Sequence, residues 1–178
     1  MTVRLVFDNS PLSHFARAGR LDTLHRLTIA FSCATTIEVR VELVSGIRDY
    51  PDIADALSLP WLDVVALATM AEITAFAGYK TELGGGPDRN VGEATVLAWA
   101  RTHEAIAIID DRAATRIAQR DGITARGSLG LIVGGLRSGV LERAEAEHLI
   151  DELRATGMYL PVDGPGLIAW AYTEGLLP

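Results

Sequence analysis

The sequence contains few of the residues that characterise several common classes of protein. Its 178 residues include one cysteine, which excludes a disulfide framework within the chain. That residue, Cys33, lies in an apolar stretch, which favours a buried side chain over a nucleophile or a metal ligand. No apolar run is as long as a membrane span, and the N-terminus lacks a basic flank followed by an apolar segment and a cleavage site. We therefore expect a cytoplasmic protein with no membrane contact.

Positive charge is also scarce. The formal net charge is −7 and Lys80 is the only lysine. Proteins that coat nucleic acid through a broad basic surface neutralise many phosphates with Lys and Arg, and this composition argues against that class. It does not exclude an enzyme that engages phosphates through bound metal ions.

Apolar residues make up 49% of the chain, enough to form the core of one domain over residues 1–178. Apolar runs and their turn signals predict strands at residues 3–7, 29–33, 61–66, 105–109 and 123–125. Helical spacing and capping signals predict helices at residues 10–18, 21–27, 36–44, 52–59, 69–83, 90–103 and 112–120, and then at 128–136, 143–154 and 166–174. Such alternation favours an α/β fold with a mainly parallel sheet covered on both faces.

Four acidic residues lie where a predicted strand ends or a predicted helix begins: Asp8, Glu42, Glu93 and Asp110. Asp8 follows the first apolar strand and Asp110 follows the fourth, so both are expected at the edge where open α/β sheets bind ligands. Carboxylates gathered there would repel one another, and hard divalent ions such as Mg²⁺ or Mn²⁺ relieve that repulsion by binding oxygen ligands. The pattern favours a metal site.

Two of these acids also have simple local explanations. Either Asp8 or Ser10 is a suitable N-cap for the helix that follows the first strand. Glu42 lies in a largely apolar helix, where a partly buried acid needs a partner, and Arg40 or Arg4 would provide one.

Local explanations exist for the other two acids as well. Asn90 and Glu93 have the spacing of a capping box, in which the glutamate bonds back to the cap residue. Asp110 and Asp111 form an acidic pair, and a helix cap accounts for one of them more easily than for both. Because one metal site explains all four positions together, we favour the metal interpretation.

Other chemistries match the sequence less well. Phosphate-binding loops need a glycine fingerprint or a Walker lysine after a strand, and the glycine run at Gly84 has neither. Ser10 follows no nucleophile-elbow pattern and occupies the position at which a dehalogenase-type phosphatase needs a second aspartate. Metal-ligand spacing for zinc is missing among the histidines, which are His14, His25, His103 and His148.

With these residues assembled, the chain resembles PIN-domain ribonucleases, in particular the VapC-like toxins of bacterial toxin-antitoxin pairs. The resemblance spans nearly the whole chain. It rests on the first acidic motif at residues 6–12 (VFDNSPL), the second at 41–43 (VEL), the third at 92–94 (GEA) and the fourth at 109–112 (IDDR). Residues 127–132 (GSLGLI) and 137–139 (RSG) are similar to one PIN subgroup whose members often sit beside a small antitoxin gene.

This resemblance implies a PIN-like three-layer α/β/α domain that hydrolyses RNA phosphodiester bonds with Mg²⁺ or Mn²⁺. Asp8 and Asp110 would bind the metal directly, and Glu42 and Glu93 would complete the ligand shell directly or through water. Neighbouring side chains that would orient these ligands are Asn9 and Ser10.

The resemblance leaves the ligand set open at three positions. Asp111 is an alternative to Asp110 as the fourth acid. Glu38 precedes Glu42 by one helical turn, so it would share or replace the role of Glu42. Asn90 stands where relatives often carry another acid.

Partners follow from the same resemblance. Arg112 and Arg116 lie one turn apart after the acidic pair and would guide RNA phosphates, although such a stripe is more often a solvated face. The resemblance favours Arg116 of the two. It also implies a cognate antitoxin protein, and a homodimer formed through the apolar helices at residues 10–18 and 36–44.

Two other functions remain open. A non-catalytic regulatory module that binds a metal would need its acidic pair near the first strand and a lysine late in the sheet, and neither is present. A metal-dependent phosphatase acting on small molecules differs from a nuclease in the width of its active site, which the sequence does not reveal.

Overall fold

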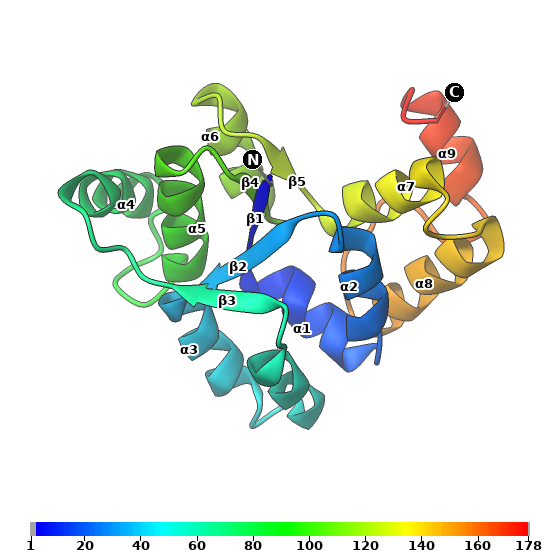
Figure 1. Ribbon diagram of the computed structural model, residues 1–178, viewed down its shortest axis with the longest axis horizontal. Coiled ribbons are helices and arrows are strands. Elements are labelled where there is room, and N and C mark those ends of the chain that lie inside the picture. The colour runs from blue at the N-terminus through cyan, green and yellow to red at the C-terminus, as the bar shows by residue number, and fades with distance from the viewer. Residues whose placement is uncertain (1–2, 178) are drawn as a thin grey trace.

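A computed structural model of the protein describes residues 3–177. At its centre is a five-stranded parallel sheet with the strand order β3-β2-β1-β4-β5 (Figure 1). The strands are β1 (Arg4–Phe7), β2 (Ser32–Thr36), β3 (Leu62–Val65), β4 (Ile106–Ile108) and β5 (Ala125–Arg126). The predicted α/β class with a parallel central sheet is confirmed.

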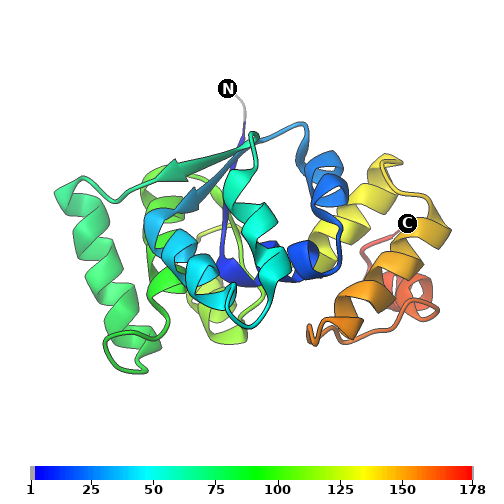
Figure 2. The same ribbon diagram turned by 90° about the horizontal axis from the view of Figure 1, so that it is seen from below.

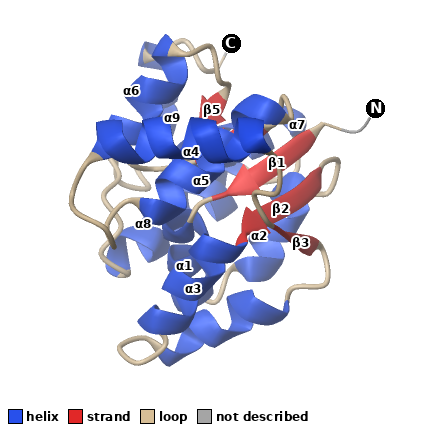
Figure 3. Cartoon of the chain, turned by 90° about the vertical axis from the view of Figure 1, so that its left-hand side faces the viewer, coloured by secondary structure: helices blue, strands red, loops and turns tan. Residues whose placement is uncertain are grey.

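Helices surround the sheet, and Figure 3 shows β1, β2 and β3 side by side among them. They are α1 (Asn9–Arg17), α2 (Leu21–Thr28), α3 (Ile37–Gly46), the 3-10 helix η1 (Pro51–Ser58), α4 (Met70–Leu83), α5 (Val91–Thr102), α6 (Arg112–Arg120), α7 (Ser128–Ser138), α8 (Arg143–Ala155) and α9 (Leu167–Thr173). Helix α4 lies at one end of the molecule, and α7, α8 and α9 lie together at the other (Figures 1 and 2). Over residues 3–177, no helix combines the length and apolar character needed to span a membrane.

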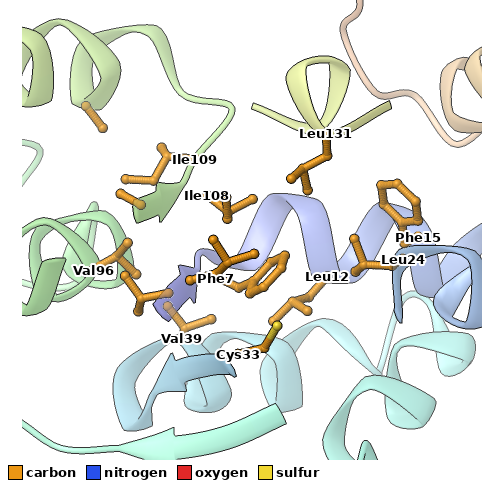
Figure 4. Close-up of a cluster of buried hydrophobic side chains, with 14 of the residues drawn as sticks. Phe7, Leu12, Phe15, Leu24, Cys33, Val39, Val96, Ile108, Ile109 and Leu131 are labelled. Carbon is orange, nitrogen blue, oxygen red and sulfur yellow. The ribbon is translucent and has the colours of Figure 1, made fainter. Parts of the chain in front are cut away.

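Beyond its exposed first residue, Arg4, the central strand β1 is buried on both faces, which explains the apolar sequence of residues 5–7. Val6 and Phe7 are both fully buried, and successive side chains of a strand point to opposite faces. Phe7 groups with Leu12 and Ile108, whereas Val39 of α3 and Val96 of α5 lie on the other side of β1 (Figure 4). The two apolar layers hold the C-terminal ends of β1 and β4 beside each other.

The second strand begins three residues later than predicted. The expected strand at residues 29–33 was wrong because α2 continues to Thr28 and a turn follows, in which the N–H of Phe31 donates to the carbonyl of Thr28. Ile29 is therefore 70% exposed rather than part of the sheet. Strand β2 then runs to Thr36, whose side chain caps α3 by accepting a hydrogen bond from the N–H of Val39.

Other bounds also differ from the prediction, including that of the last strand, which was predicted at residues 123–125 and is found at Ala125–Arg126. Helix α1 begins at Asn9, one residue earlier than predicted, so of the two candidate caps Asp8 rather than Ser10 occupies the N-cap position, and the Asp8 side chain makes no capping hydrogen bond. Residues 52–59, predicted as a helix, lie almost entirely in the 3-10 helix η1, which begins at Pro51. Without a capping hydrogen bond, the Asp8 carboxylate is free for another role.

Candidate active site

Asp8 lies at the C-terminal end of β1 and is held there by the sheet. Its N–H donates to the carbonyl of Ile108 in β4 at 3.0 Å, so the backbone at Asp8 continues the pairing of the two strands. The side chain is 2% exposed, and its Oδ1 is buried with no hydrogen-bond partner among the described residues. A buried oxygen without a partner is costly, which makes Asp8 the residue of this site most in need of a ligand.

Asp110 follows β4 and is fixed by two hydrogen bonds from one residue. Ser128, at the start of α7, donates its N–H to Oδ1 at 2.7 Å and its hydroxyl to Oδ2 at 2.8 Å. The preceding Gly127 passes so close that a Cβ there would lie 2.8 Å from Oδ1 of Asp110. Both carboxylate oxygens of Asp110 are therefore held in one orientation.

Asp111 has a different environment from Asp110. Its side chain is the N-cap of α6 and accepts a hydrogen bond from the N–H of Ala114 at 2.8 Å. The acidic pair thus divides into one exposed helix cap and one carboxylate that faces the end of the sheet. This geometry favours Asp110 over Asp111 as the fourth acid of the site.

Glu42 and Glu93 come from two helices that are tied together. The hydroxyls of Thr36, at the start of α3, and Thr95 in α5 lie 2.8 Å apart in a buried hydrogen bond. One turn earlier in α5, the N–H of Gly92 donates to Oε1 of Glu42 at 2.9 Å. A Cβ at Gly92 would lie 2.9 Å from both oxygens of that carboxylate, so only glycine permits this approach.

The capping box considered as an alternative role for Glu93 at the start of α5 does not form. Asn90 adopts a left-handed backbone conformation with φ of 58°, and its side chain makes no capping hydrogen bond. Its Nδ2 donates instead to the carbonyl of Leu83 at 3.1 Å, which closes the glycine loop before α5. Glu93 is consequently available to the site.

The acids interact electrostatically. Burial raises the pKa of Asp8 well above its ordinary value, and the charge of Glu93 raises it further, followed by the charges of Glu42 and Asp110; a hydrogen bond from the backbone of Asn9 opposes them. Burial likewise raises the pKa of Glu42, to which Glu93 adds, and the pKa of Asp110. Each of the other three predicted acids is therefore near enough to Asp8 to raise its pKa.

A cavity of about 600 Å³ opens onto this region, and its lining comprises Asp8, Ser10, His14, Glu93, Asp110, Asp111, Arg112, Met158 and Tyr159. Glu42 faces a neighbouring cavity that it shares with Asn9 and Glu38. Of the two arginines expected to contact RNA, Arg112 lines the acidic cavity, whereas Arg116 lines a separate groove beside Glu82 and Arg120.

The chemistry of the donor set fits Mg²⁺ or Mn²⁺, because every converging side chain is a carboxylate. The partnerless Oδ1 of Asp8 is the specific observation in favour of a cation. Within residues 3–177, no group of three or more His, Cys, Asp or Glu side chains is arranged closely enough to form a metal-binding cluster. The fit therefore rests on the buried carboxylate and its charged neighbours.

Comparison with known protein families identifies the chain. The family model described as DUF3368, a PIN domain, matches residues 4–164. This chain belongs to the PIN-domain family. No curated protein matches it. PIN domains are generally nucleases and typically use divalent metals.

Several residues of the site were missed by the sequence prediction. Ser128 was recognised only as part of a family motif, and His14, Met158 and Tyr159 were not assigned to the site. The last two follow α8, far along the chain from the four acids. No local pattern marks them, because only the packing of α8 against α1 and α2 brings them to the cavity.

Proposed function

We propose that this PIN domain is a metal-dependent endoribonuclease that uses Mg²⁺ or Mn²⁺ to hydrolyse RNA phosphodiester bonds. The observation that carries the proposal is the buried Asp8 carboxylate, which has one oxygen without a hydrogen-bond partner and lies among the charges of Glu93, Glu42 and Asp110. A cation bound there would satisfy the oxygen and neutralise the repulsion. The cavity beside it gives a phosphodiester access to the acids.

In this mechanism each residue has a defined task. A divalent ion, when bound, supplies Lewis acidity toward the phosphate and toward the attacking water. Asp8 and Asp110 would hold it directly, and Glu42 and Glu93 would hold it directly or through water. Ser128 keeps both oxygens of Asp110 oriented, and the N–H of Gly92 holds Oε1 of Glu42.

The cellular role that we propose is that of the toxin of a toxin-antitoxin pair, inhibited by a cognate antitoxin and acting as a homodimer. A surface feature consistent with a partner is the outer stripe of α3, where Ile37, Val41 and Val44 are 46%, 60% and 52% exposed. Growth of cells that express the protein, compared with cells that express Asp8→Asn, tests the toxin role. Light scattering of the protein and of Val41→Asp tests the dimer.

The activity is tested by incubating labelled structured RNA with the protein, with Asp8→Asn and with Asp55→Asn, in Mn²⁺, Mg²⁺ or EDTA. Asp55 lies exposed on η1 and serves as the matched control. We expect cleavage only with a divalent ion, abolished by Asp8→Asn and retained by Asp55→Asn. Equal cleavage by Asp8→Asn would overturn the site, and hydrolysis of a small phosphate ester without RNA cleavage would favour a phosphatase.

A further inference from the structure

An exposed aromatic side chain stands at the acidic cavity. Tyr159 is 73% exposed, yet it lines the same cavity as Asp8, Glu93 and Asp110. A large aromatic ring gains little stability from such a position, because most of its surface stays in water. Its placement beside the proposed cleavage site would let the ring contact a bound substrate.

The backbone that carries Tyr159 is well fixed. Helix α8 ends at Ala155, and Gly157, just beyond its C-cap Thr156, has a φ of +87° and donates its N–H to the carbonyl of Arg154 at 2.9 Å. The N–H of Met158 donates to the carbonyl of Leu153 at 3.3 Å, which completes a glycine-based helix stop. Met158 is 5% exposed and anchors the chain in the core, so the next residue is displayed from a rigid frame.

Helix α8 is in turn attached to the elements that carry Asp8. Nδ1 of His14 in α1 lies 2.6 Å from the hydroxyl of Thr156, at the end of α8. Arg20, just before α2, binds both carboxylate oxygens of Glu152 at 2.6 and 2.7 Å. These contacts fix the distance between Tyr159 and the acids at the end of β1.

A positively charged side chain, that of Arg112, contacts the tyrosine ring. The guanidinium carbon of Arg112 lies 4.9 Å from the centre of the Tyr159 ring, within cation-π range. Arg112 is the first residue of α6 and directly follows the acidic pair, and it lines the acidic cavity too. An aromatic ring and an arginine thus occupy the wall of the cavity beside the carboxylates.

We propose that Tyr159 and Arg112 form a nucleobase subsite, in which an unpaired base next to the scissile phosphodiester stacks on Tyr159 while Arg112 contacts its phosphate. This inference rests on the proposed nuclease function. Single-stranded RNA is bound largely by stacking of splayed bases on aromatic rings and guanidinium planes, whereas duplex RNA presents no free base face. The subsite also adds a favourable contact for a polyanion at an otherwise acidic cavity.

The subsite makes a quantitative prediction for single-turnover cleavage of a single-stranded RNA in Mn²⁺. Tyr159→Ala should raise the protein concentration that gives the half-maximal rate by roughly 5- to 150-fold, as expected for one lost stacking contact. The maximal rate should stay near that of the unmodified protein. Tyr159→Phe should restore binding, because the ring rather than the hydroxyl stacks.

Tyr172 offers a matched control. It is also an exposed tyrosine, 56% exposed, but it lies on α9 and lines a different groove. Tyr172→Ala should leave both kinetic constants unchanged. Thermal unfolding of Tyr159→Ala should match that of the unmodified protein, because an exposed ring is removed.

An abasic substitution in the RNA identifies the contact itself. Removing the base at one position flanking the cut should weaken binding to the unmodified protein and to Tyr172→Ala, yet cause no further loss with Tyr159→Ala. Additive losses, or a Tyr159→Ala variant that lowers only the maximal rate, would overturn the subsite while leaving the nuclease proposal intact. Absence of metal-dependent cleavage by the unmodified protein would overturn both.

Discussion

Ser128 donates hydrogen bonds to both carboxylate oxygens of Asp110, from its N–H at 2.7 Å and from its hydroxyl at 2.8 Å. The two residues are 18 positions apart and belong to different parts of the fold, since Asp110 follows β4 and Ser128 opens α7. Ser128 is fully buried, so its hydroxyl is not in contact with solvent. The position of α7 therefore determines the orientation of the Asp110 carboxylate, a proposed metal ligand.

The first prediction concerns this hydroxyl. Ser128→Ala keeps the backbone hydrogen bond but leaves Oδ2 of Asp110 without its partner, so the carboxylate loses its fixed orientation. We expect metal affinity or cleavage to fall by about 10- to 100-fold, as is typical when a residue that orients a ligand is removed. The measurement is the cleavage rate as a function of Mn²⁺ concentration.

Ser128→Thr is the control for that experiment, because it retains the hydroxyl. Recovery of Mn²⁺ dependence by the threonine variant would show that the hydrogen bond, and not only the packing, is required. If Ser128→Ala needs no more Mn²⁺ than the unmodified protein, the orienting role is wrong.

The second prediction uses the close approach of α5 to Glu42. Gly92→Ala places a Cβ 2.9 Å from both oxygens of the Glu42 carboxylate, which must move and lose its hydrogen bond from the N–H of residue 92. We expect cleavage to fall at least about tenfold. Gly78→Ala in α4 is the matched control, since a Cβ there meets no atom within 4 Å.

Gly78→Ala should preserve cleavage and raise the free energy of unfolding by roughly 0.4–1 kcal/mol, because alanine restricts the unfolded chain. Chemical denaturation followed by circular dichroism measures this change. Full activity of Gly92→Ala would mean that the position of Glu42 is unimportant.

The third prediction concerns pH and the stability of the metal-free protein. Burial raises the pKa values of Asp8, Glu42 and Asp110 in the folded state, so the folded protein holds these protons more tightly than the unfolded chain does. Their contribution to the free energy of unfolding is therefore favourable at low pH. It is lost as pH rises from the ordinary carboxyl pKa of about 4 through the raised values.

Asp8→Asn isolates one of these contributions, because asparagine cannot ionise. In EDTA at pH 7.5 we expect this variant to unfold at a temperature at least about 3 °C higher than the unmodified protein, which corresponds to about 1 kcal/mol for a chain of this size. The difference should shrink toward pH 5 and in the presence of Mn²⁺. A variant that is less stable than the unmodified protein at every pH would contradict the inference that burial and neighbouring charges disfavour the ionised form of Asp8.

The sequence predicted the sheet well where the local pattern and the tertiary structure agree. The apolar run of β1 is buried on both faces, so its composition alone indicates a central parallel strand. β2 was misplaced because its register is set by pairing with β1, Arg4 opposite Ser32, and not by its own apolar residues. Ile29 shows the limit of the pattern, since it is apolar and exposed.

The site was predictable in its acids but not in the residues that support them. Asp8 and Asp110 follow strands that the pattern identifies, so their convergence follows from the topology of a parallel sheet. Ser128 and Tyr159 reach the same place only through the packing of α7 and α8, which no local pattern encodes. The spacing of Asn90 to Glu93 also matches a capping box, and only the left-handed backbone of Asn90, which places it in the glycine loop, excludes that alternative.

The last prediction separates the two glutamates of α3. Glu42 bonds to the N–H of Gly92 and its charge raises the pKa of Asp8, so it belongs to the acidic site. Glu38 lines the neighbouring cavity with Glu42, and its Oε2 is, like Oδ1 of Asp8, buried without a hydrogen-bond partner among the described residues, but its charge is not among those that raise the pKa of Asp8. Glu42→Gln should therefore reduce Mn²⁺-dependent cleavage by at least about tenfold, whereas Glu38→Gln, which changes the same functional group one turn away, should cleave RNA at the unmodified rate. Cleavage lost in Glu38→Gln and kept in Glu42→Gln would exchange the roles of the two residues. A glutamine is neutral and cannot replace the charge of a carboxylate that binds the metal, so activity is lost only where the glutamate contributes a ligand oxygen.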